Sequence, residues 1–245
     1  MNQLQLQQPR DVGALFGDSL RVFIAHAWLF VLLSAAVVVP VEIIVEGIGL
    51  EMLTSPYDES PPLIESAVPS IVGFLVVTPI ITAICIHALH SIAEGQRPSA
   101  GQVLVAGFEA FTPLFGAVLL AAIGIAAGFV ALFVPGVYLF IRWYFVPQAV
   151  VIEGARGPAA LSRSSQIVQG SWWRSFGLVV VANVAVVIPG LLLLIPFNAV
   201  ASSTDQAVWA LVGTILASSV TTPFVALYST LLYYDLLARR PSPTY

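Results

Sequence analysis

The chain has 245 residues, of which 58% are hydrophobic and 9% are charged, with a net charge of -4 and a mean hydropathy of +0.95. A soluble fold of this length could not hide so much apolar surface, so we expect an integral membrane protein. The charge balance argues against a nucleic-acid partner, because no basic stripe stands outside the loops between apolar runs, and the single cysteine, Cys85, excludes an intrachain disulfide.

Five apolar stretches predict six transmembrane helices, since a helix needs about 20 residues to cross the hydrocarbon core. The stretch that starts at Ala110 passes Pro135-Gly136 and continues to Ile152, which is too long for one span. We therefore expect two helices joined by a tight outer turn at Pro135-Gly136. The predicted spans lie near 22–47, 67–92, 110–134, 136–153, 174–197 and 207–236.

A polar lead before each pair of spans predicts an amphipathic helix on the cytoplasmic side. In the first lead, apolar residues recur every three or four positions from Val12 to Ile24. The second begins at Pro98-Ser99 with capping-box spacing, and the third begins at Gly157-Pro158. The predicted fold is an all-α integral membrane protein with six transmembrane helices in three hairpins, each preceded by such a helix.

The nine basic residues are all arginines, and eight of them fall on one side of the predicted zigzag: Arg10, Arg21, Arg97, Arg156, Arg163, Arg174, Arg239 and Arg240. The alternate loops carry only acids: Glu42, Glu46, Glu51, Asp58, Glu59, Glu65 and Asp205. Cytoplasmic loops retain arginine, so both termini are expected in the cytoplasm. The absence of lysine beside abundant Ala, Val, Gly and Arg suggests a GC-rich bacterial genome, and hence a multi-pass protein of a bacterial plasma membrane.

Arg142 is the arginine predicted to lie deepest in the membrane, about 10 Å below the outer surface. An arginine at that depth must snorkel, reach water or pair with an acid. Glu42 and Glu46 are the carboxylates expected at a similar depth. We favour a structural ion pair over the alternative, which is a site for an anion or a lipid headgroup.

The loop after the fourth span is the strongest candidate for an interaction. The candidate residues could hold the phosphate of an anionic lipid: Arg156, Arg163 and Arg174, with Trp172 and Trp173 at headgroup depth. Gly170 of the same loop is counted among the candidate site residues. The alternative, which we favour, is that the arginines of this loop set the topology and pair with acids nearby: Glu153, Glu109 and Asp18.

Several motifs in the second half of the chain belong to a known pattern: Pro135-Gly136, Arg142, Pro147, Glu153-Gly154, Arg163-Ser164, Gly170, Trp173-Arg174 and Tyr233-Tyr234-Asp235 with Arg239. In these motifs the chain resembles the glycerophosphoryl diester phosphodiesterase membrane domain family and its six-span relatives. The resemblance implies a six-helix membrane module. It implies no phosphodiesterase activity, because fused relatives carry that activity on a separate soluble barrel, which we do not expect in these 245 residues.

A search for catalytic and metal-binding patterns gives one weak candidate. His87 and His90 are three positions apart near Cys85, but no acidic residue accompanies them in the span, so we favour a hydrogen-bonding role over a metal site. Ser164 and Ser171 have no histidine nearby that could activate them as nucleophiles. We expect neither catalysis nor a cofactor or bound metal.

Three functional classes are left. The first, which we favour from the sequence, is a non-catalytic module that scaffolds, assembles or regulates a membrane or envelope system, with lipids or another membrane protein as partners. The second is a small transporter or lipid-handling protein, in which Asn183, Arg142 and the hydroxyls before Pro223 would line a cavity. The third is an intramembrane enzyme. A polar cavity would favour the second class, whereas a bundle sealed by small residues would favour the first.

Overall fold

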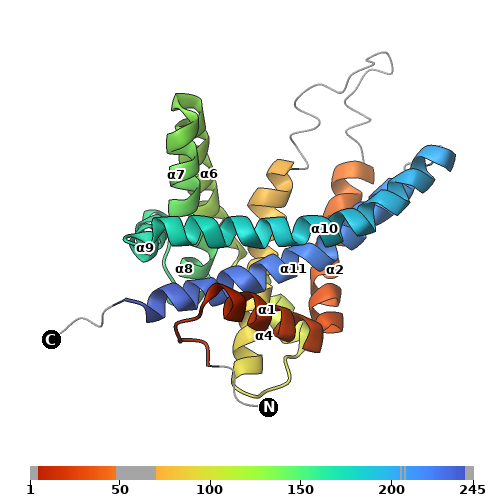
Figure 1. Ribbon diagram of the computed structural model, residues 1–245. Coiled ribbons are helices and arrows are strands. Elements are labelled where there is room, and N and C mark those ends of the chain that lie inside the picture. The colour runs from red at the N-terminus through yellow and green to blue at the C-terminus, as the bar shows by residue number, and fades with distance from the viewer. Residues whose placement is uncertain (1–4, 48–69, 205, 207, 241–245) are drawn as a thin grey trace.

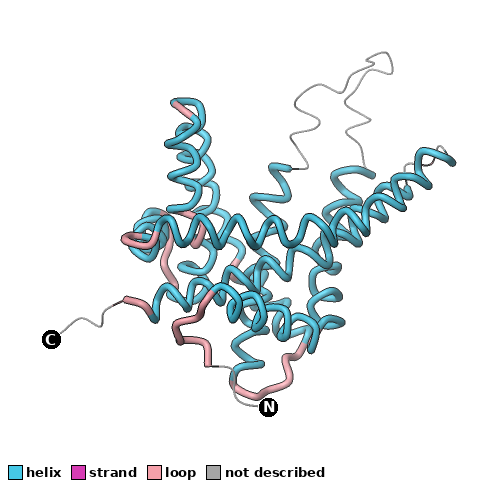
Figure 2. Tube along the Cα trace, viewed as in Figure 1, coloured by secondary structure: helices cyan, strands magenta, loops and turns pink. Residues whose placement is uncertain are grey.

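Figure 1 shows the computed structural model of the chain, which describes residues 5–47, 70–204, 206 and 208–240. Regular secondary structure in these ranges is helical, and no strand occurs in them (Figure 2). Six helices are long and apolar enough to cross a membrane: Ala27–Val45, Ser70–Ala93, Phe111–Ala131, Phe133–Glu153, Trp172–Thr204 and Val208–Ala238. An all-helical chain with six helices of transmembrane character is therefore confirmed.

The individual helices divide some of these spans and add shorter elements between them. Their bounds are α1 Val12–Ala25, α2 Ala27–Glu42, η1 Ile43–Gly47, η3 Gly73–Val77, α4 Thr78–Ala93, α5 Ala100–Glu109, α6 Phe111–Ala131, α7 Phe133–Arg142, α8 Val146–Glu153, α9 Pro158–Val168, α10 Trp172–Thr204 and α11 Val208–Ala238. The elements η1 and η3 are single π-helical turns. The short helices α1, α5 and α9 occupy the positions at which the three leads were predicted.

The first predicted span is divided at His26, so α2 begins five residues later than expected. His26 leaves the helical conformation, with φ -129° and ψ 27°, and this separates α1 from α2. Asp11 caps the start of α1 by accepting a hydrogen bond from the backbone N–H of Ala14 at 2.7 Å. At α5 the helix begins directly after Ser99, as predicted, but the Ser99 side chain makes no capping hydrogen bond.

The chain reverses direction at Leu132, three residues before the predicted corner. Leu132 is extended, with φ -166° and ψ 153°, and Pro135-Gly136 lies in the first turn of α7. Proline fits there because the first N–H groups of a helix have no intrahelical acceptor. Gly136 is required by packing, since a Cβ at this position would lie 2.4 Å from the Phe129 ring.

The fourth span is two helices and not one, because the chain leaves the α-helix between α7 and α8. Pro147 has no N–H, so the carbonyl of Trp143 cannot receive the usual i+4 hydrogen bond and accepts one from Val146 at 3.2 Å instead. The buried Ser164 of α9 bridges the gap: its hydroxyl donates to the Arg142 carbonyl at 2.9 Å and accepts from the Phe145 N–H at 3.2 Å. The break therefore leaves these backbone groups paired.

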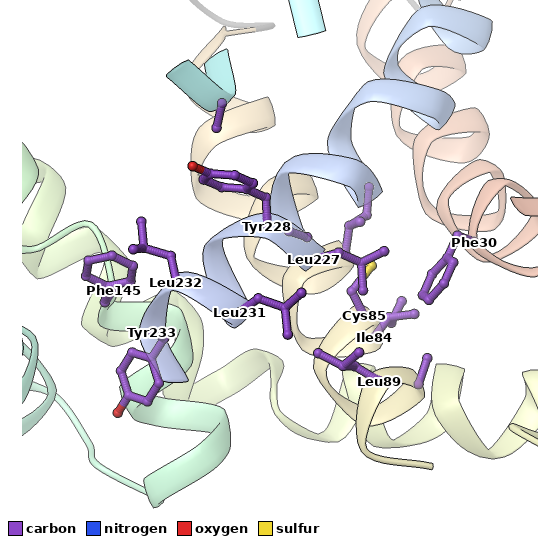
Figure 3. Close-up of a cluster of buried hydrophobic side chains, with 14 of the residues drawn as sticks. Phe30, Ile84, Cys85, Leu89, Phe145, Leu227, Tyr228, Leu231, Leu232 and Tyr233 are labelled. Carbon is purple, nitrogen blue, oxygen red and sulfur yellow. The ribbon is translucent and has the colours of Figure 1, made fainter. Parts of the chain in front are cut away.

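Helix α11 is the centre of the bundle and packs against α1, α2, α4, α9 and α10. Figure 3 shows Leu227 and Leu231 of α11 facing Ile84 and Leu89 of α4, with Phe30 of α2 beside them. In Figure 1, α10 and α11 run across the molecule, whereas α6 and α7 stand at a steep angle to them. With 33 and 31 residues, α10 and α11 are longer than a perpendicular crossing of about 20 residues requires, which suits a strong tilt.

Candidate functional site

A cavity of about 390 Å³ lies among five of the six candidate spans, and we call it the mid-span cavity. Its wall includes residues close to the middle of each of these spans: Thr82, Ala121, Trp143, Val186 and Thr222. It is partly open, and its lining is largely apolar. Trp143 and Tyr144, which lie in the interruption between α7 and α8, form part of the wall.

Gln148 of α8 is the most deeply buried polar side chain of the cavity wall, with 2% of its surface exposed. Its amide nitrogen donates to the Ser229 hydroxyl of α11 at 2.9 Å. The Ser229 hydroxyl in turn donates to the Ala226 carbonyl at 3.0 Å. The Gln148 carbonyl oxygen, Oε1, has no hydrogen-bond partner within the described residues. A buried amide oxygen without a partner is costly, so it is a strong candidate for a ligand contact.

Two threonine hydroxyls on the wall are already committed to their own helices. Thr82 donates to the Thr78 carbonyl at 2.8 Å, and Thr221 donates to the Ala217 carbonyl at 2.8 Å. Both oxygens keep lone pairs that can still accept a hydrogen bond. No ionisable Asp, Glu, Arg or His side chain lines the cavity in the part of the chain that the structure describes. The cavity therefore suits an uncharged, largely apolar ligand.

A separate ionic cluster lies at the carboxyl-terminal end of α11, around the fully buried carboxylate of Asp235. Asp235 accepts hydrogen bonds from the Arg10 backbone N–H at 2.6 Å, from Arg174 Nη2 at 3.1 Å and from Arg239 Nε at 2.9 Å. The same two arginines donate to the Arg10 carbonyl at 2.7 and 2.6 Å. The Arg10 side chain pairs with Asp18 at 3.1 Å. The cluster joins the segment before α1 to α10 and α11.

A second ion pair lies near this cluster and ties α8 to α9. Arg163 donates both Nε and Nη2 to the carboxylate of Glu153, the latter at 2.9 Å. The Tyr233 hydroxyl of α11 donates to the same carboxylate at 2.6 Å. These hydrogen bonds to Glu153 raise the pKa of Arg163 above its ordinary value. The two side chains thus form a forked contact between a guanidinium and a carboxylate. The sequence had suggested that the arginines of this loop pair with nearby acids, and Arg163 does so with Glu153.

The structure does not bring Arg142 and Glu42 together, and the side chain of Glu46 lies outside the described residues. Arg142 ends α7, which packs against α6, α9 and α10, whereas Glu42 ends α2, which packs against α1, α4, α5 and α11. The exposed Arg142 guanidinium donates to the Tyr138 hydroxyl at 3.1 Å and lies 5.7 Å from the centre of that ring. Its described contacts are thus local to its own helix.

The other predicted site residues separate into three settings. Trp173 is 78% exposed at the start of α10, a position suited to the membrane interface. Gly170 adopts φ +81° in the turn between α9 and α10, a conformation that favours glycine. Arg174 pairs with Asp235 and not with Asp18, and Glu153 and Arg163 pair with each other. The predicted loop therefore holds no single site that contains all of these residues.

The two histidines of the second span, His87 and His90, lie near the carboxyl-terminal end of α4. The His90 ring nitrogen Nε2 is hydrogen-bonded to the Tyr234 hydroxyl at 2.5 Å. Within the described ranges no three His, Cys, Asp or Glu side chains lie close enough to hold a metal ion.

Comparison with known proteins places the chain in one family. Residues 68–236 match a family described as a domain of unknown function, DUF7847, and the chain belongs to that family. The matched segment includes every residue of the mid-span cavity wall and also Asp235. No curated protein and no solved structure matches the chain. The comparison did not find the glycerophosphoryl diester phosphodiesterase membrane domain family, so that resemblance stays a prediction.

Proposed function

We propose that this DUF7847 protein is a lipid-handling membrane protein that binds a small amphiphile in the mid-span cavity. The observation that carries the proposal is the cavity itself, which is largely apolar, lies near the middle of five spans and contains a buried amide oxygen without a partner. Ligand pockets have volumes of about 300–1,000 Å³ and combine apolar walls with a few polar groups. The volume of about 390 Å³ falls within that range.

The interrupted helix beside the cavity supports the same proposal. In membrane transporters, substrate sites lie near the bilayer midplane and are formed by helices whose hydrogen bonding is broken there. The break between α7 and α8 at residues 143–145 has this position within its span. Ser164 keeps the broken backbone paired, so the interruption is a stable part of the fold.

The proposed setting is a bacterial plasma membrane, crossed by three hairpins with both termini in the cytoplasm. The packing of α2 against α4, of α6 against α7 and of α10 against α11 supports the hairpins. The arginine distribution supports the orientation. The Asp235 cluster supports the location of both termini on one side of the membrane, because Arg10 and Arg239 both bind Asp235 at the same end of the bundle. In this arrangement α1, α5 and α9 would lie along the cytoplasmic interface, in contact with lipid headgroups.

Lipid analysis of the purified protein tests the proposal. The protein is extracted in a mild detergent, its bound lipids are quantified by mass spectrometry, and the same is done for Ile125→Trp, which adds bulk to the cavity wall. Ile123→Trp is the matched control, because Ile123 lies on the same helix with its side chain 59% exposed. We expect a bound amphiphile near one per chain, reduced several-fold in Ile125→Trp only. Equal retention by both variants, or no retained lipid in the wild type, would refute the proposal.

An assembly module, the first expectation from the sequence, is the second candidate. The observation that favours it is the close glycine packing of the α6–α7 pair. A Cβ at Gly124 would lie 2.4 Å from the Trp143 ring, and one at Gly128 would lie 3.1 Å from the Gly136 Cα. Such packing makes a rigid unit on which a partner could assemble. Co-purification of a stoichiometric membrane protein, together with an absence of bound lipid, would favour this candidate.

A further inference from the structure

We infer that the mid-span cavity selects a neutral lipid whose head carries a hydroxyl group, and that Gln148 Oε1 accepts the hydrogen bond from this hydroxyl. The inference rests on the proposed function and adds to it the chemical class of the ligand and the residue that recognises it. A long-chain alcohol or a mono- or diacylglycerol has this chemistry. The hydrogen-bonding groups of the wall that are already paired within the protein decide which ligand group the others can bind.

The orientation of the Gln148 amide follows from the hydrogen bonds of Ser229. A serine hydroxyl has one hydrogen, and that of Ser229 is donated to the Ala226 carbonyl. With its hydrogen on the Ala226 carbonyl, the Ser229 oxygen accepts the hydrogen bond that the Gln148 NH₂ group donates at 2.9 Å. This fixes Oε1 on the other side of the amide, where no described residue donates to it.

Two of the threonine hydroxyls on the wall extend the same pattern. Thr82 and Thr221 give their hydrogens to carbonyls of their own helices, so they present only lone pairs to a ligand. Together with Gln148 Oε1 they form a set of acceptors on three helices, α4, α8 and α11. The complementary ligand group is a hydrogen-bond donor, which a hydroxyl supplies and an ether or ester does not.

The lack of charge on the described wall excludes the common ionic headgroups. A phosphate requires arginine, lysine or several backbone donors, and a primary ammonium group requires a carboxylate; the described wall carries none of these side chains. The aromatic side chains of the wall could contact a choline, but a choline headgroup also carries a phosphate. The arginines near α8 and α11 are engaged elsewhere: Arg163 binds Glu153, and Arg174 binds Asp235. A neutral head with an apolar body therefore fits best. The volume admits the head and the first part of a chain, with the remainder leaving through the open side.

Binding measurements with three matched probes test the inference on the full-length protein in detergent. Oleyl alcohol carries the donor, oleyl methyl ether lacks it, and oleyl phosphate replaces it with an anion. Since one hydrogen bond to a buried acceptor changes affinity by about ten-fold, the wild type should bind the alcohol about ten-fold more tightly than the ether. Oleyl phosphate should bind no better than the ether.

The variant Gln148→Leu should remove the preference for the alcohol, with the ether bound as in the wild type. Gln166→Leu, on the exposed side of α9, is the matched control and should keep the preference. If Gln148→Leu is not monodisperse, Ser229→Ala provides a second test, because the amide can then turn its NH₂ group toward the ligand. In that variant the ether should gain affinity relative to the alcohol.

The outcomes separate this inference from the proposed function. Equal binding of the alcohol and the ether by the wild type, tighter binding of oleyl phosphate, or an unchanged preference in Gln148→Leu would overturn the inference and leave the lipid-binding proposal standing. Failure of the wild type to bind any of the three probes would overturn both. Loss of the preference in Gln148→Leu alone is the result that supports the inference.

Discussion

The substitution Asp235→Asn tests the ionic cluster that joins the ends of the chain. Asparagine keeps the size of the side chain but removes its charge and replaces one oxygen with an NH₂ group. The acceptor Oδ1 can stay paired with the Arg10 N–H, whereas the group in the place of Oδ2 would face the donors of Arg174. The perturbation therefore acts on the charge and on the contact between α10 and α11, with little change in volume.

The magnitude follows from the exposure of the two arginines. A hydrogen bond to a charged group contributes about 1.5–3 kcal/mol, and removal of one partner of a fully buried ion pair costs about 3–5 kcal/mol. Here Asp235 is fully buried, but the side chains of Arg174 and Arg239 are 29% and 37% exposed, so water can partly replace the lost carboxylate. We expect a loss of about 2 kcal/mol in the free energy of unfolding.

Two measurements report this loss. Denaturant unfolding in mixed micelles gives the change in stability, and limited trypsin digestion reports how often the segment before α1 detaches, because Arg10 is 3% exposed in the folded chain. Asp11→Asn is the control for the unfolding measurement, since an asparagine carbonyl can still cap α1. The wild type is the reference for trypsin cleavage, because Asp11 directly follows the Arg10 cleavage site. A stability within about 0.5 kcal/mol of the wild type, with unchanged cleavage after Arg10, would show that the cluster does not hold the ends together.

Three further predictions concern the backbone break, the helix turn and the topology. Ser164→Ala should lower the free energy of unfolding by about 2 kcal/mol, because the Arg142 carbonyl and the Phe145 N–H lose their shared partner. A loss no larger than that caused by Ser162→Ala, at an exposed serine of the same helix, would contradict this prediction. Gly136→Ala should lower the free energy of unfolding by about 1–3 kcal/mol, because the added Cβ would clash with the Phe129 ring. Gly116→Ala, whose Cβ would meet no atom within 4 Å, should be neutral or slightly stabilising. Equal thermal stability of the two variants would contradict the close packing of Gly136 against Phe129. A cysteine at Ser162 in a Cys85→Ser background should react with a membrane-impermeant maleimide in inverted vesicles only, and labelling in intact cells would reverse the proposed orientation.

The fold was predictable from sequence where one physical requirement dominates. Long uncharged runs must be buried in lipid or protein, and this fixes the six helices of transmembrane character. The break between α7 and α8 could have been inferred from Pro147, because a proline four residues after Trp143 removes one intrahelical hydrogen bond. The compensation by Ser164 could not, since it depends on how α9 packs against α7 and α8.

The candidate site was predictable only in part, because cavities arise from packing between distant segments. Asn183, Thr221 and Thr222 were expected to line a cavity and do so. Ser218, Ser219 and Arg142, which belonged to the same expectation, are not part of its wall. Nothing in the sequence singled out Gln148 beyond its being a polar residue within an apolar stretch. Its amide oxygen is left without a partner because its amide nitrogen donates to Ser229, 81 positions later. The pair formed by Glu153 and Arg163 lay within reach of sequence reasoning, since ten positions separate them across one short turn.

The hydrogen bond from Arg10 to Asp235 joins groups 225 positions apart, and this has a consequence for biosynthesis. A ribosome finishes the start of the chain long before it makes α11, so the segment before α1 must wait, unanchored, until the last helix has been inserted. A product truncated before Asp235 would leave the guanidinium of Arg174 without its carboxylate. The contacts that join the segment before α1 to α10 and α11 therefore form at a single acid of α11, which is synthesised after the groups that it pairs with in α10 and before α1.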